Sequence, residues 1–227
     1  MNLDWQVMID SVGLFPEAAW TTFQVTTLGI FLGLVLGLIT AFLRISSIKL
    51  LNYPARIYIF LVRGTPIILQ LFIIYYGISE IIQLPSFISA VIGLGIHNGA
   101  YIGEIFRGTI QSISKGQMEA ARSLGMTYPT AMRRIVLPQA LKRAIPPLGN
   151  QFIIALKDSS LASTIAVHEI FQTARQQGSA QFSMLELLIL AGIFYLILTS
   201  IFTILVNFAE KKLKHENSEQ PEEITNA

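Results

Sequence analysis

The side chains best suited to chemistry lie inside otherwise apolar stretches. Asp158 interrupts such a stretch, with Gln151 seven residues earlier on the same helix face and Ser159 next to it. An ionisable group at the centre of a bilayer costs roughly 2.5–3.5 kcal/mol and usually faces a cavity or a partner. A carboxylate and an amide on one face suit the ammonium or guanidinium group of a small solute. The structural alternative is that Asp158 pairs with a basic side chain, such as Lys157 of a second copy, or caps a helix break.

A second set of candidates lies in another apolar stretch. Asn98 and Tyr101 are placed deeply enough to line a pathway. A buried tyrosine that has found one hydrogen bond is, however, the commoner situation. Glu104 lies near the end of the stretch, and Arg107 follows three residues later. A salt bridge between these two residues is therefore the simpler interpretation of Glu104.

The sequence contains no residue set that is typical of catalysis. It has no cysteine, which excludes disulfides and thiol nucleophiles, and its three histidines are scattered. It contains neither HExxH nor GxSxG, and no glycine-rich loop that ends in Gly-Lys-Ser/Thr. An enzyme is therefore disfavoured. The 16 basic and 14 acidic residues give a net charge of +2, which is too balanced for a nucleic-acid-binding protein.

The composition indicates that lipid is the solvent for most of the chain. Hydrophobic residues make up 52% and charged residues 13% of the 227 positions, whereas soluble domains carry about 25% charged residues. A spanning helix needs roughly 20 apolar residues. We therefore predict an all-α integral membrane protein with five transmembrane helices, the fourth of them short, polar and broken, near residues 18–43, 57–79, 81–103, 144–168 and 187–209.

The distribution of Lys and Arg predicts the orientation in the membrane, because cytoplasmic loops carry an excess of both. Placing the N-terminus outside puts nearly all positive charge inside. The domains that follow are an extracytoplasmic segment 1–17, a transmembrane domain 18–212 and a disordered cytoplasmic tail 213–227. The connection 165–182 then lies outside, as a re-entrant helix or as a loop.

Two helices carry glycine at four-residue spacing: Gly29, Gly33 and Gly37 in one, and Gly95, Gly99 and Gly103 in the other. Such stripes let helix backbones approach closely in lipid. Glycine is also simply common in membrane helices. Two three-member stripes favour packing, with His97, Tyr101 and Glu104 on a different face of their helix.

The long inner loop, residues 109–146, has helical patterning. One helix is expected over 115–124, with Gly125 as its left-handed stop. A second is expected over 127–136, and Pro138 is expected to end it. The residues alone leave two interpretations of this basic block open, namely a docking surface for another protein and an amphipathic segment lying on anionic lipid.

Residues 119–138 resemble the EAA loop of ABC-importer permeases. The matching positions, with Arg122 between them, are Glu119, Ala120, Ala121, Gly125, Ile135, Leu137 and Pro138. Three further stretches resemble the polar amino acid subfamily: Arg-Gly-Thr-Pro at 63–66 with Gln70 downstream, 100–108 and 156–159. The likeness covers roughly residues 15 to 212 and favours the docking interpretation of the loop.

The resemblance implies the membrane subunit of a type I ABC importer in the bacterial inner membrane. It implies a homodimer or a pair with a second permease, two ABC ATPase subunits and an extracytoplasmic amino-acid-binding protein. It also implies that ATP and Mg²⁺ bind the ATPases, with no cofactor in this chain, and that a polar amino acid, basic ones included, is carried. A non-transporting scaffold that docks an ATPase is the alternative. The candidate substrate residues are Asp158, Gln151, Ser159, Tyr101, Asn98, Glu104 and Gln70.

Overall fold

The computed structural model describes residues 3–78 and 81–218, and all regular structure within them is helical. This confirms the predicted all-α class. The elements are, in chain order, α1 (Trp5–Ser11), η1 (Val12–Leu14), α2 (Phe15–Ile45), α3 (Lys49–Arg63), α4 (Ile67–Phe72), η2 (Ile73–Gly77), α5 (Ser86–Gln111), α6 (Lys115–Ser123), α7 (Tyr128–Ala131), η3 (Met132–Val136), α8 (Leu137–Asp158), η4 (Ser159–Ile165), α9 (Ile170–Ala180) and α10 (Met184–Ser218).

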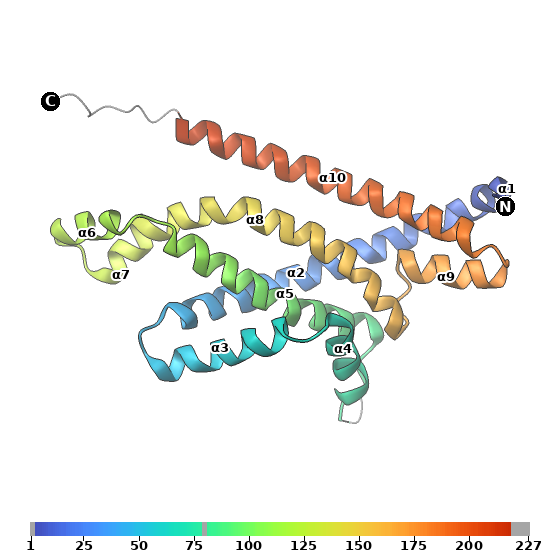
Figure 1. Cartoon of the computed structure of the whole chain (residues 1–227), viewed down its shortest axis with the longest axis horizontal. Coiled ribbons are helices and arrows are strands. Elements are labelled where there is room, and N and C mark those ends of the chain that lie inside the picture. The colour runs from blue at the N-terminus through green and yellow to red at the C-terminus, as the bar shows by residue number, and fades with distance from the viewer. Residues whose placement is uncertain (1–2, 79–80, 219–227) are drawn as a thin grey trace.

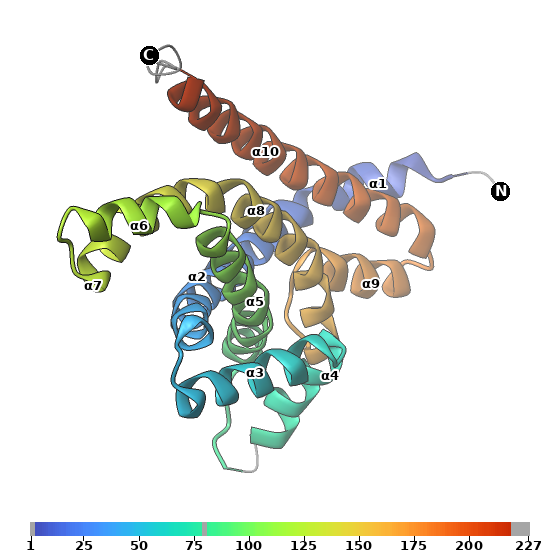
Figure 2. The same cartoon turned by 60° about the vertical axis from the view of Figure 1, so that its left-hand side comes forward.

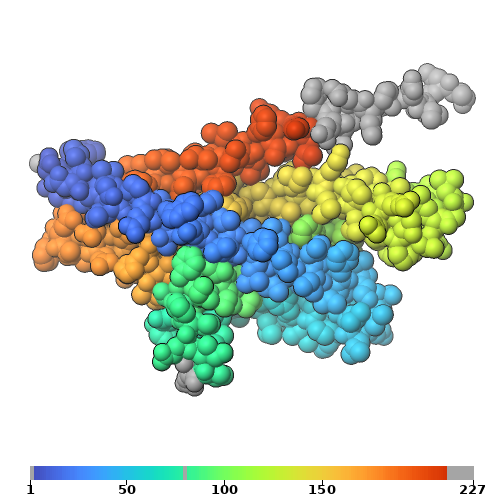
Figure 3. Space-filling view, turned by 180° about the vertical axis from the view of Figure 1, so that it is seen from behind, coloured from blue at the N-terminus to red at the C-terminus, as the bar shows by residue number. Residues whose placement is uncertain are grey.

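The helices form an elongated bundle with α5 at its centre (Figures 1 and 2). Helices α6 and α7 protrude at one end, whereas α1 and α9 lie at the opposite end. Helix α2 crosses the back of the molecule, where Figure 3 shows its surface between α10 and the α3–α4 region. The two ends that the sequence assigns to opposite sides of the membrane are therefore also opposite ends of the fold.

The two glycine stripes pack against each other. A Cβ on Gly37 of α2 would come within 2.9 Å of the backbone nitrogen of Gly103 on α5, and one on Gly33 within 3.3 Å of the nitrogen of Gly99. From the other side, a Cβ on Gly95 would come within 2.9 Å of the Leu32 Cβ. The packing that the spacing predicted is confirmed, and each stripe turns out to be the other's partner.

The second predicted span is not a straight helix. Helix α3 and the segment Ile67–Gly77 meet at 106°, across the break after Arg63. Gly64 ends α3, and Pro66 then starts α4 from an extended conformation. A proline biases the residue before it away from helical geometry, which explains why the chain turns here.

Pro138 does not end a helix, contrary to the prediction. It lies in the first turn of α8, where the missing N–H of a proline is tolerated. The π-helix η3 precedes α8, so the chain passes from α7 to α8 without a loop. Helix α8 then ends at Asp158, where 3-10 helix η4 begins, and the connection 165–182 contains the short helix α9.

Two helical stretches, Trp5–Ile45 and Met184–Leu213, are long and apolar enough to cross a membrane, and the bent pair of α3 with Ile67–Gly77 makes a third candidate. The count of five spans stays a prediction, because α5 and α8 carry polar side chains that lower their hydropathy. The first part of the tail, which we predicted to be disordered, is helical up to Ser218. Residues 219–227 lie outside the described part of the chain.

We predict that Gly37→Val destabilises the permease, because its side chain would overlap the α5 backbone. Overpacking of this kind costs about 1–3 kcal/mol. Thermal unfolding of the purified protein in detergent measures the effect. Gly192→Val is the matched control, since nothing lies within 4 Å of a Cβ at that position in α10. Equal unfolding temperatures for the two variants would contradict the close α2–α5 contact.

Candidate functional site

The break between α3 and α4 is closed by the side chain of Gln70. Its amide nitrogen lies 2.8 Å from the Val62 carbonyl oxygen and 3.1 Å from that of Thr65, so it donates to backbone groups that the helix break leaves free. Its Oε1 lies 3.1 Å from Nδ1 of His97 on α5. Broken helices survive in membranes only where freed backbone groups are satisfied again. Gln70 does this and joins the break to α5.

The aromatic face of α5 lies beside the same break. The Tyr101 ring packs against His97, with ring centroids 5.1 Å apart, and the Arg63 guanidinium lies 5.0 Å from the Tyr101 centroid. A cation over an aromatic face is attracted by the ring quadrupole. The Arg63 side chain at the end of α3 is exposed, but this contact holds it toward α5. The sequence placed Tyr101 in this region but did not reveal its contacts with Arg63 and His97.

Asn98 and Gln151 meet in the interior between α5 and α8. The Gln151 Nε2 donates to Asn98 Oδ1 at 2.8 Å, and Asn98 Nδ2 donates to the Leu94 carbonyl oxygen at 2.8 Å. Asn98 is fully buried, and Gln151 is 7% exposed. Two candidate residues from different predicted spans thus form one buried amide pair. No hydrogen bond joins Gln151 to Asp158 within the described residues, although both lie in α8.

Asp158 ends α8 and is half-buried. Within residues 3–78 and 81–218 its carboxylate makes no hydrogen bond or ion pair, and its side chain does not cap η4. The neighbouring Ser159 is buried, and its hydroxyl donates to the Leu156 carbonyl oxygen at 2.7 Å. Ser159 therefore serves its own helix turn, whereas Asp158 keeps its hydrogen-bonding capacity unused.

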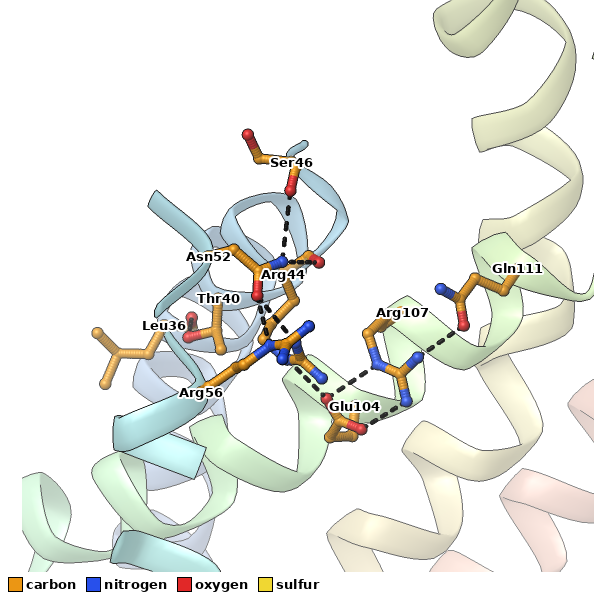
Figure 4. A network of polar contacts seen from close by, with 9 residues as sticks. All are labelled: Leu36, Thr40, Arg44, Ser46, Asn52, Arg56, Glu104, Arg107 and Gln111. Atoms are coloured by element: carbon orange, nitrogen blue, oxygen red, sulfur yellow. Dashed lines mark hydrogen bonds and ion pairs between the residues drawn. The ribbon is translucent and has the colours of Figure 1, made fainter. Parts of the chain in front are cut away.

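Glu104 is held in a polar network that joins α2, α3 and α5 (Figure 4). Arg107 donates to both of its carboxylate oxygens, at 3.0 and 2.7 Å, and Arg44 of α2 lies 3.6 Å away. Asn52 of α3 donates to the Arg44 carbonyl oxygen and accepts from Arg56 Nε at 2.6 Å. The predicted Glu104–Arg107 salt bridge is thus present. The carboxylate joins α5 to α2, and Asn52 links α3 to the same network through Arg44. The contact with Arg44 could not be predicted from local spacing.

The two helix breaks lie close together. Leu71 of α4 belongs to the same buried apolar cluster as Ala162 and Ile165 of η4, and Val25 and Leu94 supply the wall from α2 and α5. Figure 2 shows α4 beside the end of α8. Discontinuous helices are the usual places for solute sites in transporters, because they free polar groups inside the membrane. The substrate candidates thus divide among the α3–α4 break, the buried amide pair and the free carboxylate at the end of α8.

The EAA segment, residues 119–138, is a rigid block at the end of the bundle. Helix α6 ends in a Schellman motif, in which Gly125 N donates to Arg122 O at 3.0 Å and Met126 N donates to Ala121 O at 3.1 Å. Gly125 has a φ of +82°, as predicted for a left-handed stop. Arg122 Nη1 also donates to the Met126 carbonyl oxygen at 3.0 Å, which closes the same turn.

One face of the EAA segment is anchored and the other is free. Val136 and Ala140 pack with Ile110 and Ile113 at the end of α5, with Ile135 and Leu137 partly buried nearby. Of the residues that match the EAA motif, with Arg122 and Leu124 beside them, Glu119, Ala120, Arg122, Leu124 and Pro138 are exposed, whereas Ala121 is buried. Leu124 at the tip is 82% exposed. The block presents a mixed polar and apolar surface on a firm support.

Apolar helices, a buried amide pair, a broken helix pair and a protruding helical block together suit the membrane subunit of a transport system. The chain belongs to the family described as binding-protein-dependent transport system inner membrane component, whose model matches residues 33–215. It is accordingly a transmembrane subunit of an ABC importer.

The most similar proteins include permeases of known systems. The chain is 35% identical over 216 residues to the arginine transport system permease protein ArtQ of Bacillus subtilis, covering 94% of this chain and 99% of that protein. It is 36% identical over 217 residues to the glutamine transport system permease protein GlnP of Escherichia coli, covering 94% and 99%. A crystal structure of an amino acid ABC transporter with histidines matches with a TM-score of 0.89 and 37% identity, over 93% of this chain and 100% of that one.

We predict that Gly125→Val weakens the association with the ATPase and lowers transport, because valine avoids a positive φ and would distort the turn after α6. The permease should still insert into the membrane. Co-purification with the ATPase and solute uptake measure the two effects. Gly108→Val is the control, since Gly108 has no positive φ and nothing within 4 Å of its Cβ. Normal uptake by the Gly125 variant would refute the role of this turn.

Proposed function

We propose that this chain is the permease of an ATP-driven importer for a polar amino acid, with Asp158 meeting a cationic group of the substrate. The observation that carries the proposal is the free, half-buried carboxylate at the end of α8. Family membership and the similarity to arginine and glutamine permeases support the substrate class. A carboxylate in a predicted span that has no hydrogen bond or ion pair among the described residues is explained more readily by a substrate than by a structural role.

The other substrate candidates take different roles in this proposal. Gln70 shapes the site by holding the α3–α4 break, and Tyr101 lies beside that break with Arg63. The Asn98–Gln151 pair supplies a polar interior without charge. Ser159 and Glu104 already have partners, so they act through the protein rather than on the substrate.

The proposed mechanism is alternating access in a dimer of permeases, because one chain of this size is a thin wall for a sealed pathway. Two ATPase subunits bind ATP and Mg²⁺ and close on each other, and the EAA segment of each permease sits in a groove of one ATPase. Ala120 and the exposed face of α6 fit such a contact, and Gly125 fixes the block's shape. ATP binds the two states with different affinity, which supplies the bias between inward and outward access. An external binding protein delivers the substrate.

We predict that Asp158→Asn weakens the apparent affinity for a basic amino acid, because it keeps the size of the side chain and removes its charge. A charge-assisted contact is worth about ten-fold to a hundred-fold in affinity. Uptake of labelled arginine and glutamine by the reconstituted transporter measures the loss. Asp10→Asn, at an exposed carboxylate of α1, is the matched control. Unchanged uptake kinetics would refute the proposal, and loss of the assembled dimer would favour the structural alternative.

We also propose that the N-terminus lies outside and the C-terminus inside, on the basis of the Lys and Arg distribution. The sequence lacks cysteine, so single cysteines can be introduced freely. Gly13→Cys near the start has open space around its side chain, and Lys212→Cys near the end is exposed. We expect a membrane-impermeant thiol reagent to label only the first variant in intact cells. Labelling of both variants from one side would end the five-span topology.

A further inference from the structure

A second buried carboxylate lies at the opposite end of the molecule from the EAA segment. Glu169 precedes α9 and is 0% exposed. Its two carboxylate oxygens accept hydrogen bonds from the first turn of α9, from Gln172 N at 2.7 Å and from Phe171 N at 3.0 Å. These contacts make it the N-cap of α9, since the first amides of a helix have no partner within the helix.

Glu169 also reaches beyond its own helix. Tyr195 of α10 donates its hydroxyl hydrogen to the Oε2 atom that accepts from Phe171. On the other side, Thr22 of α2 accepts from Ile170 N at 3.2 Å. The first turn of α9 is therefore fastened to two long helices by polar contacts, and we call Glu169, Tyr195 and Thr22 the α9 clamp.

Capping alone does not explain a glutamate at this position. Ser, Thr, Asp and Asn are the preferred N-caps and satisfy the same amides with a shorter side chain. The surroundings are apolar, with Phe15, Ile170 and Leu187 in one buried cluster, and no cation bonds to the carboxylate among the described residues. Burial raises the pKa of Glu169 to about 7. What glutamate adds is the reach to Tyr195, at the expense of burying a carboxyl group.

The α9 clamp joins the start of α9 to α10, so that a displacement of α9 would also move α10. Helix α10 runs for 35 residues from the α9 end of the bundle toward the end that carries the EAA segment (Figure 1). Its first turns are buried against α1, α2 and α9 through Leu187, Leu190 and Ala191. Further along, Ile204 and Phe208 are 67% and 70% exposed. On the inward face Phe202 packs against Phe152 of α8, with ring centroids 4.5 Å apart, and Val206 lies against Gly149. Helix α10 therefore connects the α9 end of the bundle to α8.

We infer that Glu169 is a positioning residue that makes α10 follow displacements of α9, and so passes contact at the outer end of the permease to the spanning helices. The inference rests on the proposed function for its direction, because that function places α9 outside, on the side of the binding protein. The buried hydrogen bonds transmit the displacement, because they are short-range and directional. Apolar contacts alone would allow the helices to slide past each other.

The test uses the complete transporter of permease, ATPase and binding protein in proteoliposomes. Tyr195→Phe removes only the hydroxyl, and Glu169→Asp keeps a carboxylate that can cap α9 but shortens its reach to Tyr195. Basal ATP hydrolysis should change little in either variant. Hydrolysis stimulated by the binding protein should fall about ten-fold in each, with no further fall in the double variant, because a shared contact can be lost only once. Tyr53→Phe, an exposed tyrosine on α3, is the control and should leave both rates unchanged.

A proportional fall of basal and stimulated hydrolysis would overturn the inference, because it would mark a merely structural role. So would multiplicative losses in the double variant, which would show that the two side chains act independently. Hydrogen exchange of the isolated permease tests the clamp apart from the proposed function. Faster exchange over residues 170–180 in Tyr195→Phe supports the clamp and unchanged exchange refutes it. A wild-type complex that the binding protein fails to stimulate would refute the outward direction of the coupling and with it the proposed function.

Discussion

The contact between the α2 and α5 backbones is the constraint on which the rest of the structure depends. In lipid, burying apolar side chains between helices gives no hydrophobic stabilisation, because the lipid tails are equally apolar. Helix association therefore relies on close packing and hydrogen bonds. Glycines at four-residue spacing supply that packing along most of two turns on each helix, with Gly33 against Gly99 and Gly37 against Gly103. Because one face of α5 is used up in this way, its opposite face is free to carry His97, Tyr101 and Glu104.

Several polar groups inside the bundle are compensated by a partner side chain or by the backbone. Gln70 satisfies the backbone at the α3–α4 break, Asn98 and Gln151 satisfy each other, and Glu104 is neutralised by two arginines. A buried polar group without a partner is costly, and each pair removes that cost. Asp158 differs from these residues, because its carboxylate has no hydrogen bond or ion pair within the described residues.

Much of this arrangement could be predicted from the sequence, because periodicity and spacing are local properties. The glycine stripes identified the packing faces, Gly125 marked the end of α6, and the Glu104–Arg107 pair followed from a three-residue spacing. Contacts between helices could not be derived in this way. Nothing local connects Asn98 to Gln151, Arg44 to Glu104 or Glu169 to Tyr195, which are far apart in the chain. The prediction for Pro138 was wrong for a physical reason. Proline breaks a helix interior but fits a first turn, and the π-helix η3 before it places Pro138 in the first turn of α8.

The exposed tip of the EAA segment has a consequence for the subunit before it is assembled. Leu124 and Tyr128 are 82% and 51% exposed on a block that projects from the bundle. Exposed apolar side chains on a protruding surface favour nonspecific association with other proteins. With the proposed orientation, a permease made in excess of its partners would expose this apolar surface in the cytoplasm, where chaperones and proteases act on such surfaces. The turn that we propose to contact the ATPase would then also help the cell to keep the numbers of the two subunits matched.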